Sequence, residues 1–151
     1  MNKLAGRKNK KGERGSILAV SALGMLSVLL AVGMGVDISR FYIAKTELQN
    51  AADASALAAV SGLNSTDKGI IAATDRAVKA MNHYNFDKTG VTFTRANVLF
   101  AKNLAGPYMS EAAAKLAPHD IRFVQVTTPA SAIPVSFAVS VLGSSKNLTA
   151  T

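Results

Sequence analysis

The chain has 151 residues, a formal net charge of +8 and no cysteine, and 49% of its residues are hydrophobic. The lack of cysteine excludes disulfides, thiolate metal sites and thiol nucleophiles. The positive charge is concentrated at one end, because the first fifteen residues hold six cations and a single anion, Glu13. This basic tail adjoins an apolar run and lacks interleaved aromatic residues. It therefore indicates contact with anionic lipid rather than with nucleic acid.

An uncharged, mostly apolar run extends from Ser16 to Val36, with Leu23 and Leu30 inside it. As a helix, this run would be ~31 Å long, enough to cross a hydrocarbon core of ~30 Å. Cations next to a span resist translocation. We therefore expect a single-pass anchor with a cytoplasmic N-terminus and the chain from Asp37 onward outside. The cations that set this orientation are Lys3, Arg7, Lys8, Lys10, Lys11 and Arg14.

The same run has a second interpretation as the core of a cleaved signal peptide, with small residues at 31–33 for the cleavage site. Such cores usually hold ~7–15 apolar residues, and this run is longer. A helical pattern also continues beyond the run instead of giving way to a new domain. These two observations favour a retained anchor.

The helical pattern continues over residues 37–62, where one stripe is apolar or small and Asn50 and Asp53 lie opposite it. Gly62 is the expected stop. A helix over residues 16–61 would be a rod of ~69 Å, half in lipid and half in water. The stripe consists of Phe41, Ala44, Leu48, Ala51, Ala52, Ser55 and Ala59.

Two further sets of residues lie within the expected span and just outside it. Ser27, Ala31 and Gly35 recur every four residues, which either permits close helix association or simply reflects the small residues common in spans. Asp37 and Arg40 lie one helical turn apart and form either a local ion pair or a contact with a neighbouring subunit. We take both sets, with the apolar stripe, as a candidate packing interface that also allows self-association.

Residues 63–151 predict a small antiparallel-sheet domain with two short helices, so that the whole chain is α+β. Thr66 or Asp67 is the expected N-cap of the first helix. The chain ends inside an expected strand, as would a fragment of a longer product or a short member that ends on an edge strand. The expected helices cover 67–82 and 108–117, and the expected strands cover 91–100, 121–128, 135–142 and 147–151.

Two motifs follow the apolar run at a characteristic spacing: Val-Asp-x-x-Arg at 36–40 and Leu-Gln-Asn-Ala-Ala-Asp-Ala at 48–54. Together with the run and the Arg-Gly-Ser-Ile at 14–17, they make residues 14–62 similar to the N-terminal region of TadG-like proteins. These belong to the TadE/TadG group, which is linked to tight-adherence (Flp-type) pilus assembly in bacteria. The resemblance implies an inner-membrane protein that helps to assemble such a pilus, or is a minor pilin-like component of it, with pilus-assembly or pilin-like proteins as partners.

The sequence departs from the family pattern at two places. Pilin-type members are cut after a glycine and carry Glu five residues later, whereas Gly15 is followed there by Val20, so we expect the anchor to be retained. Longer members carry a von Willebrand factor A-type domain with an Asp-x-Ser-x-Ser metal site. Residues 53–57 fail that pattern at Leu57, and no such domain is expected.

The chemical inventory is small, with His83 and His119 as the only histidines and no nucleophile beside a base. We therefore expect no enzyme activity, metal or cofactor. The alternative to a pilus role is a membrane-anchored or secreted periplasmic binding or sensor module. It would use the small polar face of the strand predicted at 135–142 to hold a ligand.

Overall fold

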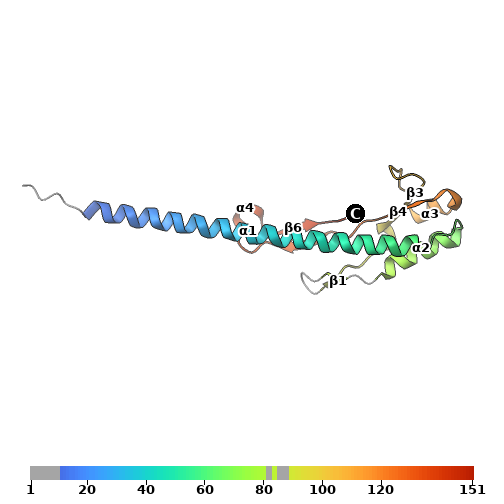
Figure 1. The fold of residues 1–151 in the computed structure, drawn as a ribbon, viewed down its shortest axis with the longest axis horizontal. Helices are drawn as coiled ribbons and strands as arrows, with labels where there is room; N and C mark the ends of the chain where they lie inside the picture. Colours follow the sequence, from blue (N-terminus) through green and yellow to red (C-terminus); the bar gives the residue numbers. More distant parts are fainter. Residues whose placement is uncertain (1–10, 81–82, 85–88) are drawn as a thin grey trace, which may run out of the picture.

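A computed structural model describes residues 11–80, 83–84 and 89–151. Helix α1 (Lys11–Val60) is continuous over 50 residues, which corresponds to a rod of ~75 Å. We call the residues that follow α1 the second half of the chain. Its described residues lie along the C-terminal part of α1, and the N-terminal part of α1 extends beyond them (Figure 1). This confirms the long N-terminal helix expected from the apolar run and the stripe that follows it.

Helix α2 (Asp67–Lys79) follows α1 after a short turn and packs against it. Its N-cap is Thr66, one of the two residues expected in this role. The Thr66 hydroxyl accepts a 3.0 Å hydrogen bond from the Gly69 N–H. Gly62 lies in the turn, and a Cβ there would stand 2.7 Å from the backbone nitrogen of Ala73. The absence of a side chain at Gly62 therefore lets the two helices meet closely.

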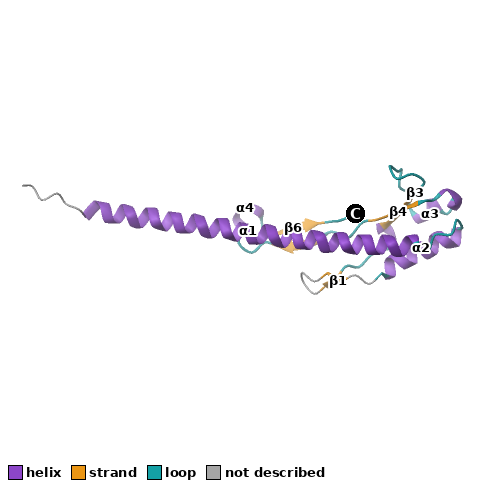
Figure 2. Cartoon of the chain, viewed as in Figure 1, coloured by secondary structure: helices purple, strands orange, loops and turns teal. Residues whose placement is uncertain are grey.

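The strands that the structure describes form three separate two-stranded antiparallel ribbons rather than one sheet (Figure 2). The expected α+β class is thus confirmed, with α1 as the support to which the small elements attach. The ribbons are β1 (His83–Tyr84) with β2 (Thr89–Gly90), β3 (Val98–Ala101) with β4 (Phe123–Val126), and β5 (Ser131–Pro134) with β6 (Ser145–Leu148). The remaining elements are α3 (Glu111–Ala114), α4 (Val139–Leu142) and the 3₁₀ helices η1 (Arg95–Asn97) and η2 (Pro118–Asp120).

Two clusters of buried apolar side chains hold these elements on α1. The larger cluster joins the C-terminal end of α1 to α2, α3 and the β3–β4 ribbon, and it includes Ala51, Ala59, Ile70, Phe93, Phe100 and Val126. The smaller cluster lies nearer the N-terminal, apolar part of α1 and joins α1 to the β5–β6 hairpin through Ala44, Leu48, Ile133 and Ala150. Burial of apolar area in these clusters is the main force that holds the second half on the helix.

The prediction of a strand at 135–142 is wrong. The alternation of apolar and small polar residues there indicates a strand, but the segment is a loop that leads into α4, while β5 occupies Ser131–Pro134, before the expected strand begins. Three backbone N–H groups of the loop donate to a side chain of α1 instead of to a neighbouring strand. Local alternation could not reveal that distant acceptor.

Three other predicted elements are shorter or displaced. The strand expected at 91–100 is confined to β3, because Asn97 accepts hydrogen bonds from the Thr94 backbone and hydroxyl and forms the 3₁₀ turn η1. The helix expected at 108–117 is reduced to α3, because the Met109 backbone pairs with Phe100 across a β-bridge. The strand expected at 147–151 is β6, which begins earlier, at Ser145.

Candidate functional site

The N-terminal part of α1 is an apolar helix that the rest of the described chain leaves uncovered. Every residue from Gly15 to Val32 is exposed, including Leu23 and Leu30 with 65% and 55% of their surface accessible. A helix that is apolar on all sides is stable only when it is surrounded by protein or lipid. Among the described residues, α1 is the one helix long and apolar enough to cross a membrane. Its composition and exposure therefore fit a membrane anchor.

The residues expected to define the anchor and its orientation fall at both ends of this part of α1. Ser16 is exposed at the start, and Val36, with 43% of its surface accessible, lies where the second half of the chain begins to cover the helix. Lys11 and Arg14 belong to the first turns of α1. The other four expected orientation cations, Lys3, Arg7, Lys8 and Lys10, lie outside the described residues.

The small residues Ser27, Ala31 and Gly35 are all exposed on α1. The Ser27 hydroxyl donates to the Leu23 carbonyl at 2.8 Å, and a Cβ built at Gly35 meets nothing within 4 Å. The chain itself therefore leaves this stripe open, and helix association through it stays a prediction.

Gly33, which is not part of that stripe, is the glycine of the expected span that contacts a distant part of the chain. A Cβ on Gly33 would stand 2.6 Å from Cβ of Phe137. Neither residue could be identified from the sequence, because one small residue among several in a span carries no signal about its partner. The contact shows that the C-terminal segment reaches back to the last turn of the expected span.

Asp37 is the residue that holds this segment in place. Its carboxylate accepts hydrogen bonds from the N–H groups of Ser136, Phe137 and Ala138 at 3.0, 2.9 and 2.8 Å, and only 1% of its surface is accessible. Burial acts to raise the pKa of Asp37, but the three donors and the positive charge of Arg40 hold this pKa below its ordinary value. The ionised Asp37 carboxylate therefore accepts from three consecutive backbone N–H groups that have no partner in a strand.

Arg40 contacts the same loop from one helical turn further along α1. Its guanidinium donates to the Ser136 hydroxyl, while Asp37 accepts from the Ser136 N–H. The two expectations for this pair were a local ion pair and a contact with a neighbouring subunit. In the structure, the backbone groups that donate to Asp37 belong to a distant part of the same chain.

The apolar stripe of α1 is covered by the chain itself. Ala44, Leu48, Ala51, Ala52 and Ser55 are each 3% accessible or less, and Phe41 is half-buried. Asn50 and Asp53, expected on the opposite face, are exposed. The stripe is thus an internal packing surface in this structure, and a partner protein would have to contact other faces of the helix.

The β5–β6 hairpin runs along α1 with its loop directed toward the apolar end of the helix. At the open end of the hairpin, the Lys45 ammonium donates to the Thr149 carbonyl, and the Gln49 amide donates to the Thr151 carbonyl at 2.8 Å. At the loop end, Asp37 receives the three N–H bonds described above. The hairpin is therefore held to α1 at both ends, and it lies along the helix in Figure 1.

The described residues line hollows beside the hairpin and at the opposite end of the molecule. An apolar groove of about 360 Å³ lies between α1 and β6 and is lined by Ile38, Phe41, Tyr42, Lys45 and Leu148. A second hollow, of about 340 Å³, lies at the far end of the molecule beside α3 and is lined by Arg95, Ala96, Ser110, Glu111, Ala112 and Lys115.

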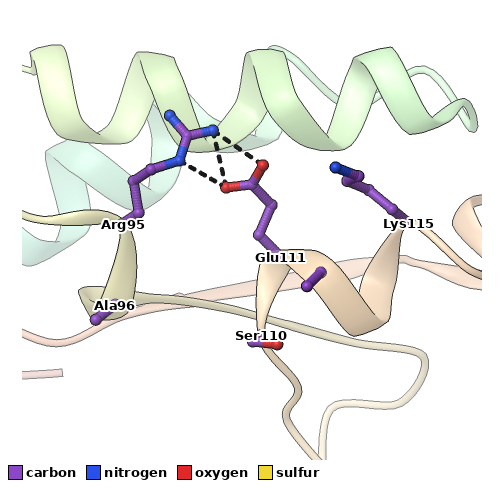
Figure 3. A pocket seen from close by; sticks show the side chains of 6 residues that line it. Arg95, Ala96, Ser110, Glu111 and Lys115 are labelled. Atoms are coloured by element: carbon purple, nitrogen blue, oxygen red, sulfur yellow. Dashed lines mark hydrogen bonds and ion pairs between the residues drawn. The ribbon is translucent and has the colours of Figure 1, made fainter.

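The main polar feature of the second hollow is an ion-pair network. Arg95 and Lys115 flank Glu111 (Figure 3), and the Arg95 guanidinium donates to both Glu111 oxygens at 2.8 and 2.9 Å. It also pairs with Asp75 on α2. The two carboxylates raise the pKa of Arg95 above its ordinary value. Arg95 thus joins η1, α2 and α3. We interpret the polar residues of this hollow as a structural link between these elements.

Residues 15–62 match the family model described as "Putative Flp pilus-assembly TadE/G-like". This segment is thus similar to the TadE/G-like family. The TadE/G-like segment covers α1 from its exposed apolar part to the turn before α2, and it includes Gly33, Asp37 and Arg40. It associates the chain with Flp/Tad pili. No curated protein and no solved structure matches the chain.

Proposed function

We propose that the chain is a single-pass inner-membrane protein that acts in assembly of a Flp/Tad-type pilus, or as a minor pilin-like component of it. The observation that carries this proposal is the exposed apolar helix at Gly15–Val32, which lies inside the TadE/G-like segment. Lipid is the environment that suits such a helix. The basic residues before it favour a cytoplasmic N-terminus and a periplasmic second half.

The architecture suggests how such a protein would work. Helix α1 continues without a break from the anchor to Val60. The second half would therefore be held at a fixed distance from the membrane and not be joined to the anchor by a flexible linker. The hairpin contacts at Asp37 and Lys45 hold the second half against this rod. A rigid rod with a fixed periplasmic module is suited to placing a contact surface beside other envelope components.

The alternative, a binding or sensor module, relied on a small polar strand face at 135–142. That strand is absent, and residues 136–138 use their N–H groups to bind Asp37. Nothing in the segment then offers the polar face that this function needs, and we do not propose it.

The orientation is tested with a reporter enzyme that is active only in the periplasm, fused after Thr151. The fusion should be active in the native sequence and should lose activity when the six cations of residues 3–14 are replaced by neutral residues. The matched control replaces cations of the second half, such as Lys68, Lys102 and Lys115, and should leave the reporter active. An inactive fusion in the native sequence would reverse the orientation.

The pilus role is tested by deleting the gene in its host and counting surface pili by electron microscopy. The native gene should restore pili, and a double Leu26→Arg, Leu30→Arg variant should not, because each arginine in a span costs about 2.5–3.5 kcal/mol of insertion free energy. Leu104→Arg, at an exposed loop position, is the matched control and should restore pili. Unchanged piliation in the deletion strain would refute the role.

A further inference from the structure

The loop of the β5–β6 hairpin carries an exposed apolar surface at the level of the anchor. Phe137, Val139 and Val141 have 60%, 45% and 71% of their surface accessible. We call residues 136–143 the hairpin tip. In Figures 1 and 2 the tip, marked by α4, lies beside α1 close to the point where the helix emerges from the rest of the molecule.

The depth of the tip follows from its contacts with α1. The Phe137 N–H is bound at Asp37, but its Cβ lies against Gly33, one helical turn closer to the N-terminus. A hydrocarbon core of ~30 Å accommodates ~20 helical residues. A span that begins at Ser16 therefore places Gly33 inside the core, next to its outer edge, and the Phe137 side chain extends from the surface toward that level.

The chemistry of the tip suits this position. The hairpin from Ser131 to Leu148 contains one charged residue, Lys146, and it lies outside the tip. Asp37, the acidic residue in contact with the tip, has its carboxylate bound by three N–H groups, as a charge beside hydrocarbon requires. Arg40 and Lys146 then lie on the water side, where cations meet lipid phosphates.

The apolar side chains of α1 next to the tip are also exposed. Val32, Met34 and Val36 have 61%, 38% and 43% of their surface accessible. They flank Gly33, which contacts Phe137, so exposed apolar side chains of the helix and of the tip lie at the same level of α1. The tip thus widens the membrane-facing surface of the anchor instead of forming a separate patch.

We propose that the hairpin tip inserts into the outer leaflet of the membrane beside the anchor, so that the protein contacts lipid through a helix and a loop. This inference rests on the membrane anchor proposed above. It goes beyond it by assigning a lipid contact to residues 136–143, which lie outside the TadE/G-like segment. The second contact would restrict rotation and tilt of α1 in the bilayer.

The test uses the full chain, which has no native cysteine, reconstituted into vesicles of phosphatidylethanolamine and phosphatidylglycerol. Single cysteines at Val141 and at Leu23 are labelled with an environment-sensitive fluorophore, as are controls at Asn147, on the same hairpin, and Leu104, at an exposed loop position. Spin-labelled lipids then report contact with acyl chains. The label at Val141 should emit at shorter wavelength and be quenched, like that at Leu23, while the Asn147 and Leu104 labels should not.

The outcomes separate this inference from the anchor itself. Quenching at Leu23 without quenching at Val141 would leave the anchor intact and refute insertion of the tip. A blue-shifted Val141 label that lipid does not quench would mean that a second copy of the chain covers the tip, and would also refute it. An unquenched Leu23 label would refute both the anchor and the inserted tip.

Discussion

Gly33 and Phe137 are packed so closely that a single methyl group at Gly33 would stand 2.6 Å from the Phe137 Cβ. One residue belongs to the expected span and the other to the far end of the chain. Their contact, with the adjacent Asp37 hydrogen bonds, sets where the second half of the chain begins relative to the expected span. It is also the part of the structure most open to direct tests.

Gly33→Ala should displace the hairpin tip. The clash is with a Cβ atom, which cannot move without its backbone, and overpacking of this kind costs ~1–3 kcal/mol. Hydrogen exchange of the Phe137 and Ala138 amides, in detergent micelles, should become faster. Gly35→Ala gains the same helix propensity, but the added methyl group meets nothing within 4 Å. Exchange of the Phe137 and Ala138 amides should therefore be unchanged in this variant. Equal behaviour of the two variants would contradict the contact.

Asp37→Asn should release the same loop while leaving α1 folded. An amide has one acceptor oxygen and presents donors to N–H groups that need an acceptor. Exchange at Ser136, Phe137 and Ala138 should rise by about tenfold or more, the size expected for loss of hydrogen bonds to a charged group. Asp53→Asn is the matched control, since Asp53 is exposed and accepts a bond from Gln49. Retained protection in Asp37→Asn would mean that the carboxylate does not hold the loop.

The Asp37 contact should also depend on pH. Because the pKa of Asp37 is lowered on folding, from an ordinary value of 3.8, its contribution to stability is fully present above about pH 4 and is lost as the pH falls through the folded-state pKa. The amide nitrogen shifts of Phe137 and Ala138 should therefore titrate with a midpoint below 3.8. Asp37→Asn should abolish that titration, and a midpoint above the ordinary value would show that burial outweighs the three donors.

Ala52→Trp should destabilise the packing of the second half on α1. Ala52 is 1% accessible, and a bulky side chain in such a place costs ~1–3 kcal/mol or more. Asn50→Trp, two residues earlier on the exposed face, should be tolerated. Thermal unfolding of the two variants gives the comparison. Intermolecular crosslinks from a cysteine at Ala52 would contradict the finding that the chain itself covers this stripe.

Arg95→Met should loosen the link between α2 and α3. Arg95 is half exposed, so solvent weakens each ion pair, and the paired network is worth about 1 kcal/mol or less. Lys102→Met removes the single exposed pair with Asp120 and should cost less. Denaturant unfolding distinguishes the two losses. A larger effect for Lys102→Met would show that the Arg95 network does not stabilise the fold.

The features that local periodicity controls were predictable. Residues such as Leu48, Ala51 and Ser55 repeat at helical spacing, so their shared buried face follows from one element alone. The N-cap at Thr66 likewise depends on a bond to the nearby Gly69. The TadE/G-like match belongs to the same helix. In each case the predictive signal comes from residues that lie close together in the sequence.

What only the tertiary structure decided is the fate of residues 135–142. Their alternation fits a strand, but a strand also needs a neighbouring strand to accept its N–H groups. Here the acceptor is the Asp37 carboxylate, at the other end of the chain. Sequence alone determined that Asp37 lies just beyond an apolar helix. Only folding brought it to the hairpin tip, because hydrogen bonds between distant segments depend on packing that no local pattern records.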